Sequence, residues 1–181
     1  IFASCGVHGD GGKLRESLAA KARAAGMSIC GGNCMGFYNN EIGLRVAGYP
    51  ALQAMEPGSI GWLAQSGSVF GALAHNDERL KFNVAISSGA ELVTTAADYL
   101  RWMANHENIR VIGMFLESVR DPAGFAAALE LAANKDVPVV ILKVGRTAAS
   151  AEMALSHTGA IAGRDAAYTA LFKRYGVVQV D

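Results

Sequence analysis

The sequence lacks the features that mark nucleic-acid-binding, membrane and secreted proteins. Its 16 basic and 16 acidic residues balance, and lysine and arginine form no basic stripe, which argues against a nucleic-acid partner. No apolar run approaches the roughly 20 residues that span a bilayer. The amino-terminal residues have no basic region followed by an apolar one. We therefore expect a cytoplasmic protein that has neither nucleic acid nor membrane as a partner.

Cysteine and metal-binding patterns are scarce as well. The three cysteines, Cys5, Cys30 and Cys34, are an odd number, have no second cluster to share a metal with, and include no Cys-x-x-Cys pair. A disulfide framework is therefore not expected, and the thiols fit a reducing compartment. We expect no metal site in this chain, and we expect Cys30 to be buried.

Familiar catalytic and nucleotide-binding motifs are incomplete. No full Gly-x-Gly-x-x-Gly follows an apolar run, and residues 9–14 lack two of the positions that a phosphate loop requires. Neither Ser66 nor Ser68 has the glycine flanks of a nucleophile elbow. Three histidines have no spaced partners and are interpreted as structural or surface residues: His8, His75 and His106.

What the 181 residues do contain is a hydrophobic fraction of 51% and a regular alternation of apolar and helical segments. Five apolar runs predict strands, at residues 59–65, 82–88, 110–117, 137–144 and 177–180. Helical patterns between and after them predict helices over residues 69–80, 95–105, 122–134 and 165–175. Asp121 is placed to cap the third helix, with Pro122 as its first residue. Because continuous apolar runs are typical of strands covered on both faces, we predict an α/β fold. Its five-stranded sheet is parallel, doubly wound and flavodoxin-like, in the order 2-1-3-4-5.

The first residues follow a different pattern. Residues 1–5 and 27–30 predict short strands on either side of a helix over residues 13–25, which Gly26 ends. Such a β-α-β unit is too small for a core of its own. Because the chain starts at Ile1 within a strand-like run, we interpret it as part of a longer polypeptide.

Two units are therefore predicted. Residues 1–31 are expected to be the tail of a preceding domain, and residues 32–181 to form the flavodoxin-like domain. Within the second unit, residues 36–57 carry scattered glycine and proline and are expected to cross to the main sheet.

Three features meet at one edge of this predicted sheet. Open parallel sheets bind ligands beyond the carboxyl ends of their strands, where the strand order reverses. The first strand ends in residues 65–68, the third ends at Glu117, and the segment after the fourth contains His157. We expect all three at the same rim.

The end of the first strand can bind an anion. Ser66 or Ser68 can cap the following helix, and Gly67 lets backbone N–H groups approach a ligand closely, which suits phosphate. The alternative is an ordinary strand-to-helix turn with a serine cap.

The other two features supply a reactive imidazole and a carboxylate. His157 lies among the small residues of segment 156–163, and an imidazole can be a nucleophile, a base or a ligand. Glu117 can hold the far nitrogen of that ring and fix its tautomer. The alternatives are a surface histidine, and a surface carboxylate paired with Arg120. Together with an anion site, this set favours a phosphohistidine intermediate over serine hydrolysis.

Five segments resemble the motifs of one family, in that family's order: residues 31–36, 65–68, 115–121, 143–147 and 156–159. The family is that of the NDP-forming acyl-CoA synthetases, which includes ADP-forming acetate–CoA ligase and, more distantly, succinyl-CoA synthetase. The resemblance is to their α part and spans essentially the whole chain. It implies that residues 1–31 are the last β-α-β piece of the family's CoA-binding Rossmann-like domain. Gly32 stands where the family has proline, which loosens that junction.

The resemblance implies a role for each matched residue. His157 would carry the phosphoryl group and Glu117 would stabilise the phosphohistidine. The helix that starts at Ser66-Gly67-Ser68 would receive the phosphate. Asn33 and Cys34 would lie near the thioester end of CoA.

The resemblance also implies the reaction of an acid–thiol ligase: acyl-CoA, ADP and phosphate give a carboxylate, CoA and ATP, or the reverse. CoA and ADP or ATP with Mg²⁺ would be substrates of the complete enzyme, and no tightly bound cofactor is expected in this chain. Its partner would be an ATP-grasp domain or β subunit, reached by movement of the histidine loop. We expect an oligomer in which this chain alone does not complete the reaction.

Two other readings remain open at this stage. One is a regulatory CoA-ligase-like module of a protein acetyltransferase, which is expected to lack the phosphorylatable histidine, so His157 argues against it. The other is a flavodoxin-like FMN-binding protein, which a colourless purified protein would exclude.

Overall fold

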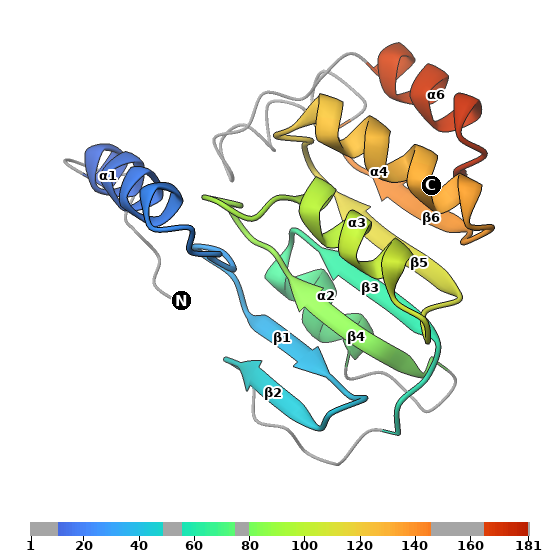
Figure 1. Ribbon diagram of the computed structural model, residues 1–181, viewed down its shortest axis with the longest axis horizontal. Helices are drawn as coiled ribbons and strands as arrows, with labels where there is room; N and C mark the ends of the chain where they lie inside the picture. The colour runs from blue at the N-terminus through green and yellow to red at the C-terminus, as the bar shows by residue number, and fades with distance from the viewer. Residues whose placement is uncertain (1–10, 49–55, 75–79, 146–164, 181) are drawn as a thin grey trace.

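The computed structural model describes residues 11–48, 56–74, 80–145 and 165–180. These residues form one mixed sheet flanked by helices (Figure 1). The strands are β1 (Gly36–Asn39), β2 (Leu44–Ala47), β3 (Ile60–Ala64), β4 (Phe82–Ser87), β5 (Val111–Leu116), β6 (Val139–Lys143) and β7 (Val178–Val180). The helices are α1 (Gly11–Ala24), α2 (Gly67–Ala74), α3 (Ala96–Asn105), α4 (Pro122–Asn134) and α6 (Asp165–Arg174).

The five predicted strands are present and parallel, in the predicted order. The described part of the sheet runs β2-β1-β4-β3-β5-β6-β7, so strands two, one, three, four and five of the prediction lie side by side. In the register of the central strands, Leu63 of β3 lies between Ile86 of β4 and Met114 of β5. The strand order reverses between β3 and β5, which is where the prediction put the ligand-binding edge.

A hairpin extends the sheet beyond the five predicted strands. β1 pairs antiparallel with β4, from Gly36 opposite Ser87 to Asn39 opposite Val84, and β2 pairs antiparallel with β1. The prediction of a crossing segment at residues 36–57 was therefore incomplete. Each of these strands has only four residues, which is too short to show the alternation that identifies a strand in sequence.

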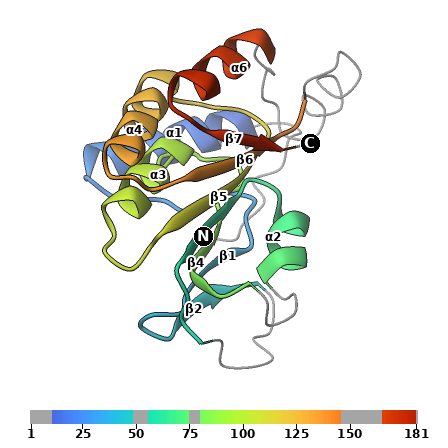
Figure 2. The same ribbon diagram turned by 90° about the vertical axis from the view of Figure 1, so that its right-hand side faces the viewer.

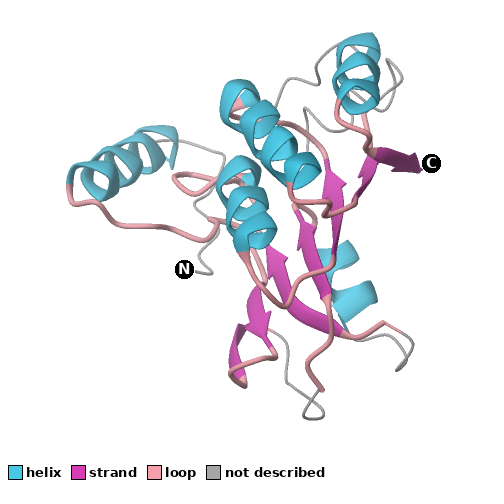
Figure 3. Cartoon of the chain, turned by 45° about the vertical axis from the view of Figure 1, so that its right-hand side comes forward, coloured by secondary structure: helices cyan, strands magenta, loops and turns pink. Residues whose placement is uncertain are grey.

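The prediction of a strand at residues 27–30 was wrong, because these residues form no strand. Their backbone groups have other partners: the Met27 N–H donates to the Ala22 carbonyl at 2.9 Å, and the Ile29 N–H donates to Thr94 Oγ1 at 3.2 Å. The predicted helix over residues 13–25 is α1, which projects to one side of the sheet (Figure 3). Arg23 Nη2 in α1 donates to the Leu92 carbonyl at 2.9 Å. The strand-like residues 1–5 lie outside the described residues.

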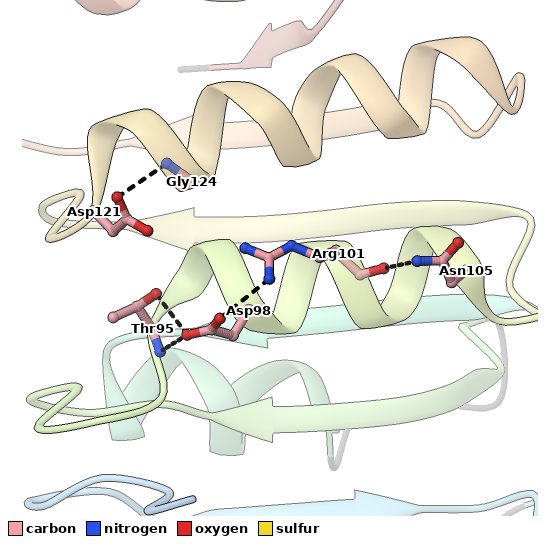
Figure 4. Close-up of polar contacts among 6 residues, drawn as sticks. All are labelled: Thr95, Asp98, Arg101, Asn105, Asp121 and Gly124. Atoms are coloured by element: carbon pink, nitrogen blue, oxygen red, sulfur yellow. Dashed lines mark hydrogen bonds and ion pairs between the residues drawn. The ribbon is translucent and has the colours of Figure 1, made fainter. Parts of the chain in front are cut away.

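The predicted helix boundaries are confirmed where capping signals are strong (Figure 4). α4 begins at Pro122, and the Asp121 side chain accepts a hydrogen bond from the Gly124 N–H at 2.9 Å. Thr95 precedes α3, and the Asp98 carboxylate accepts from both its N–H and its hydroxyl at 3.0 Å. Within the described residues, no helix is long and apolar enough to cross a membrane.

Helices cover both faces of the sheet (Figure 2). On one face α3 and α4 pack over β3 and β5, where Leu100, Ile112 and Phe125 are fully buried. On the other face α2 packs over β3 and β4, and Phe70 lies 5.3 Å from the Tyr38 ring of β1. All six residues of β4 are buried, as expected for a strand covered on both sides.

We predict that Leu100→Ala lowers the free energy of unfolding by about 2–5 kcal/mol, because it leaves a cavity under α3. Urea denaturation measures this change. Arg101→Ala is the matched control on the same helix. Its side chain is exposed and its ion pair with Asp98 spans 3.8 Å, so it should change stability by less than about 1 kcal/mol. Equal effects of the two substitutions would contradict this packing.

Candidate functional site

The predicted site residues that the structure describes lie at the carboxyl edge of the parallel strands, called the rim below. Ala64 pairs with Phe115 and Leu116 pairs with Lys143, so β3, β5 and β6 end side by side. The Gln65 N–H continues this pairing by donating to the Phe115 carbonyl at 3.1 Å. The rim therefore brings the end of β3 to Glu117, whereas His157 lies outside the described residues.

The turn after β3 has the capped geometry predicted from its serines. Ser66 Oγ accepts from the Val69 N–H at 3.5 Å, and the Ser66 carbonyl accepts from the Phe70 N–H at 3.0 Å. Ser66 thus caps α2, and Ser68 is exposed at its start. The first N–H groups of a helix have no acceptor within the helix, so this end attracts anions.

Gly67 is required at this turn by a close neighbour. A Cβ at Gly67 would lie 2.8 Å from Met35 Cγ. Met35 belongs to the segment that precedes β1, and its N–H donates to Ser87 Oγ at 3.0 Å. The contact packs the segment around Asn33 and Cys34 against the start of α2.

Two buried side chains hold the backbone of Glu117 from opposite sides. The Glu117 N–H donates to Gln65 Oε1 at 2.7 Å, and its carbonyl accepts from Lys143 Nζ at 2.8 Å. Gln65 and Lys143 are 7% and 3% exposed. Lys143 Nζ also lies 4.9 Å from the centre of the Tyr168 ring, a cation–π contact. Glu117 itself is half-buried at the rim.

Gln65 uses both ends of its side-chain amide. Its Oε1 also accepts from the Ser118 N–H at 3.0 Å, and its Nε2 donates to the Ser118 carbonyl at 2.8 Å and to Glu91 Oε1 at 2.8 Å. Ser88 Oγ donates to the same Glu91 oxygen at 2.8 Å. This buried network joins the ends of β3 and β5 to the loop that follows β4.

The Glu91 carboxyl is 3% exposed. Its burial raises its pKa, while hydrogen bonds from Gln65, the Ala96 N–H and Ser88 act in the opposite direction. Burial dominates because a charged carboxylate loses its hydration in a low-dielectric interior.

The 31–34 turn, at the amino end of β1, packs on the same loop. The carbonyls of Gly31 and Gly32 accept from the N–H groups of Leu92 and Ala90 at 2.7 and 2.8 Å. These bonds place exposed Asn33 and buried Cys34 at the rim.

The thiols of Cys30 and Cys34 interact. A hydrogen bond from Cys30 lowers the pKa of the Cys34 thiol, with a further contribution from the Gly36 N–H. The same pairing raises the pKa of Cys30, and burial adds to it. In the structure, Cys34 Sγ donates to the Cys30 carbonyl at 3.6 Å, and Cys30 Sγ donates to the Ser87 carbonyl at 3.5 Å. Cys30 is only partly buried, not fully as expected.

The sequence reasoning missed Ser88 and Glu91, and it quoted Gln65 and Lys143 only within motifs, without a role. All four lie at carboxyl ends of parallel strands, and this position was the available signal. His106, interpreted as structural or surface, makes a 3.3 Å contact with Glu41 near the opposite edge of the sheet.

Residues 57–181 match the family described as succinyl-CoA ligase like flavodoxin domain. The chain belongs to this family. The match confirms the flavodoxin-like fold. Together with the relatives below, it also confirms the resemblance to the NDP-forming acyl-CoA synthetases.

The chain is similar to two archaeal ligases in sequence and to a third synthetase in structure. It is 32% identical to ADP-forming acetate–CoA ligase I of Archaeoglobus fulgidus, over 98% of this chain and 26% of the relative. It is 31% identical to the α subunit of ADP-forming acetate–CoA ligase I of Pyrococcus furiosus, over 94% of this chain and 37% of the relative. The solved dinucleotide-forming acetyl-coenzyme A synthetase 1 of Ca. Korarchaeum cryptofilum, in complex with phosphate and ADP, superimposes with a TM-score of 0.84. It is 28% identical, over 93% of this chain and 37% of that one. The chain thus spans about a quarter to just over a third of these relatives.

We predict that Gly89→Ala lowers the free energy of unfolding by about 2–4 kcal/mol. Gly89 has a φ of +57°, and its Cβ would lie 2.4 Å from the carbonyl oxygens of Gly32 and Asn33. The matched control is Gly43→Ala, with a φ of +64° and nothing within 4 Å, which should cost only about 1 kcal/mol of backbone strain. Urea denaturation that gives the same loss for both would contradict the packing of the 31–34 turn on Gly89.

We also predict a pH-dependent effect of Glu91→Gln. Burial raises the pKa of Glu91 from its ordinary value of 4.5, so the folded chain binds more protons than the unfolded chain between the two pKa values. The free energy of unfolding therefore falls as the pH rises through this interval, and Glu91→Gln removes that component. Urea denaturation at about pH 5 and about pH 8 should show the wild type losing stability relative to the variant. A difference that stays constant with pH would contradict the shift.

Proposed function

We propose that this chain is the phosphohistidine-bearing part of an NDP-forming acyl-CoA synthetase. The observation that carries the proposal is the rim, where the capped start of α2 and the end of β5 at Glu117 lie side by side. An anion-binding helix start beside a carboxylate suits a phosphate that is passed to and from an imidazole. The family match and the ADP-forming ligases among the relatives support the reaction class.

The reaction divides into three steps. Phosphate attacks the thioester of acyl-CoA, which releases CoA as the leaving group and forms an acyl phosphate. The imidazole of His157 then attacks phosphorus, which releases the carboxylate and leaves a phosphohistidine. Finally ADP accepts the phosphoryl group, which regenerates the imidazole and yields ATP. The reverse sequence activates a carboxylate.

Each rim residue has a role in this scheme. The N–H groups at Ser66-Gly67-Ser68 would bind the phosphate during the first two steps. The Glu117 carboxylate would accept a hydrogen bond from the unphosphorylated ring nitrogen and stabilise the phosphohistidine. Asn33 and Cys34 would contact the thioester end of CoA, since the 31–34 turn packs next to the start of α2.

The complete enzyme needs more than this chain. We assign residues 1–31 to the end of a CoA-binding unit and residues 32–181 to the phosphohistidine domain. The β1–β2 hairpin supports that boundary, because it belongs to the main sheet. An ATP-grasp domain or β subunit would bind ADP or ATP with Mg²⁺. This is in keeping with the comparisons, because the chain covers only 26% and 37% of the length of the two ligases. The reported relatives give no support to a regulatory acetyltransferase module.

We predict that the complete enzyme, incubated with labelled ATP and Mg²⁺, forms an acid-labile, base-stable phosphoprotein. The label should be absent from His157→Asn, because phosphohistidine is the only phosphorylated side chain in the scheme. Autoradiography of protein separated at alkaline pH measures it. Label that persists in His157→Asn would contradict the assignment.

We further predict that Glu117→Gln lowers the yield of phosphoprotein by roughly 10-fold or more, because the neutral amide stabilises a phosphoimidazole ring less than a carboxylate does. The far-ultraviolet circular dichroism of the variant should match that of the wild type, since the backbone contacts of Glu117 do not involve its side chain. An unchanged yield would remove Glu117 from the site.

A further inference from the structure

We propose that Gln65 and Glu91 are positioning residues of this site, which hold Glu117 where phosphoryl transfer needs it. The inference rests on the proposed function, and it concerns residues to which neither the motifs nor the relatives assign a role. The Gln65 side chain acts directly on the backbone of Glu117, and Glu91 acts on Glu117 through Gln65.

The first step is the hydrogen bonding of Gln65 to the backbone at the end of β5. Glu117 follows the last residue of that strand, so the direction of its side chain depends on the peptide groups at residues 117 and 118. Gln65 binds three polar groups of these two residues: the Glu117 N–H at 2.7 Å, the Ser118 N–H at 3.0 Å and the Ser118 carbonyl at 2.8 Å. Without Gln65, these buried or half-buried groups lose their partner.

The second step is the orientation of the Gln65 amide. An amide can rotate by half a turn and exchange its oxygen with its nitrogen, which would place NH₂ against the two N–H groups. Glu91 and the Ser118 carbonyl oppose this rotation, because each accepts a hydrogen bond from Gln65 Nε2 at 2.8 Å. Ser88 Oγ donates to the same Glu91 oxygen at 2.8 Å and so fixes the carboxyl. Glu91 thus reinforces the amide orientation in which the oxygen faces Glu117.

The third step links the two ends of the site. The N–H groups on either side of Glu91, those of Ala90 and Leu92, hold the carbonyls of Gly32 and Gly31 at 2.8 and 2.7 Å. Glu91 itself has a φ of +51°. Its backbone conformation sets the direction of its side chain relative to the two N–H groups that flank it. One short loop therefore sets both the 31–34 turn and, through Gln65, the position of Glu117.

Small displacements matter for this chemistry. A shift of about 1 Å in a group that orients a reacting atom can lower a rate by roughly 100-fold. Glu117 is anchored by backbone contacts alone on the Gln65 side, so a loss of those contacts changes the placement of its carboxylate without changing its charge.

The test loads the complete enzyme with label from ATP, and then measures the rate at which saturating acetate and CoA discharge the phosphohistidine, because that transfer is the step that takes place at the rim. Gln65→Met removes the amide at nearly constant volume, and Glu91→Ala removes the carboxyl. We expect each to lower this rate by roughly 10- to 100-fold, while the KM for ATP in the loading step stays unchanged, because ATP binds on the partner domain. Glu91→Gln keeps an oxygen that can accept from Gln65 and Ser88, so it should lose much less than Glu91→Ala.

A double-mutant comparison separates positioning from loss of stability. Because Glu91 acts through Gln65, Gln65→Met/Glu91→Ala should be about as slow as Gln65→Met alone. Asn40→Ala is the matched control. Asn40 is a buried amide that donates to the Phe82 carbonyl at 2.9 Å, near the opposite edge of the sheet. It should lower stability without lowering the rate, alone or with Gln65→Met.

Wild-type rates in folded Gln65→Met and Glu91→Ala would overturn the proposal, as would independent effects that multiply in the double variant. If Gln65→Met does not fold, a Glu91→Gln rate no higher than that of Glu91→Ala would overturn it equally. A wild type without label, or label in His157→Asn, would be a failure of the proposed function instead.

Discussion

Four hydrogen bonds around the buried amide of Gln65 join the ends of β3 and β5 to the loop after β4. The parallel strands already align these ends, but strand pairing stops at the last paired residue. Beyond it the backbone needs side-chain partners, because buried polar groups without them cost free energy. Gln65 supplies these partners on one side of Glu117 and Lys143 supplies one on the other, so the rim is shaped by side chains rather than by the sheet alone.

A few specific contacts also bring segments that are far apart in sequence together at the rim. The 31–34 turn lies on the 88–92 loop through two backbone hydrogen bonds, and Gly89 permits that approach because any Cβ would meet the turn. Met35 fills the space above Gly67 at the start of α2. Backbone hydrogen bonds and close packing therefore hold the 31–34 turn, the 88–92 loop and the start of α2 together.

Local signals in the sequence carried the fold prediction. Asp121 and Pro122 mark the start of α4 within one turn, and the long apolar runs identify the parallel strands. Their order was predicted from the arrangement that is usual for five such strands. The β1–β2 hairpin was missed because four-residue strands are too short to show periodicity. Residues 27–30 were predicted as a strand from composition, although the N–H groups of Met27 and Ile29 bond to Ala22 of α1 and to Thr94 rather than to a neighbouring strand. The role of Gln65 could not be predicted, since its partners lie 26 and 53 residues away and no local pattern encodes such pairing.

Hydrogen exchange of the Glu117 and Ser118 amides tests most directly whether Gln65 holds the rim. Both N–H groups donate to Gln65 Oε1, so they should exchange slowly although they lie beyond the end of β5. In Gln65→Met their protection should fall by roughly 10-fold or more, while amides within β5 keep theirs. Rapid exchange of both amides in the wild type, or protection that Gln65→Met leaves unchanged, would contradict the account.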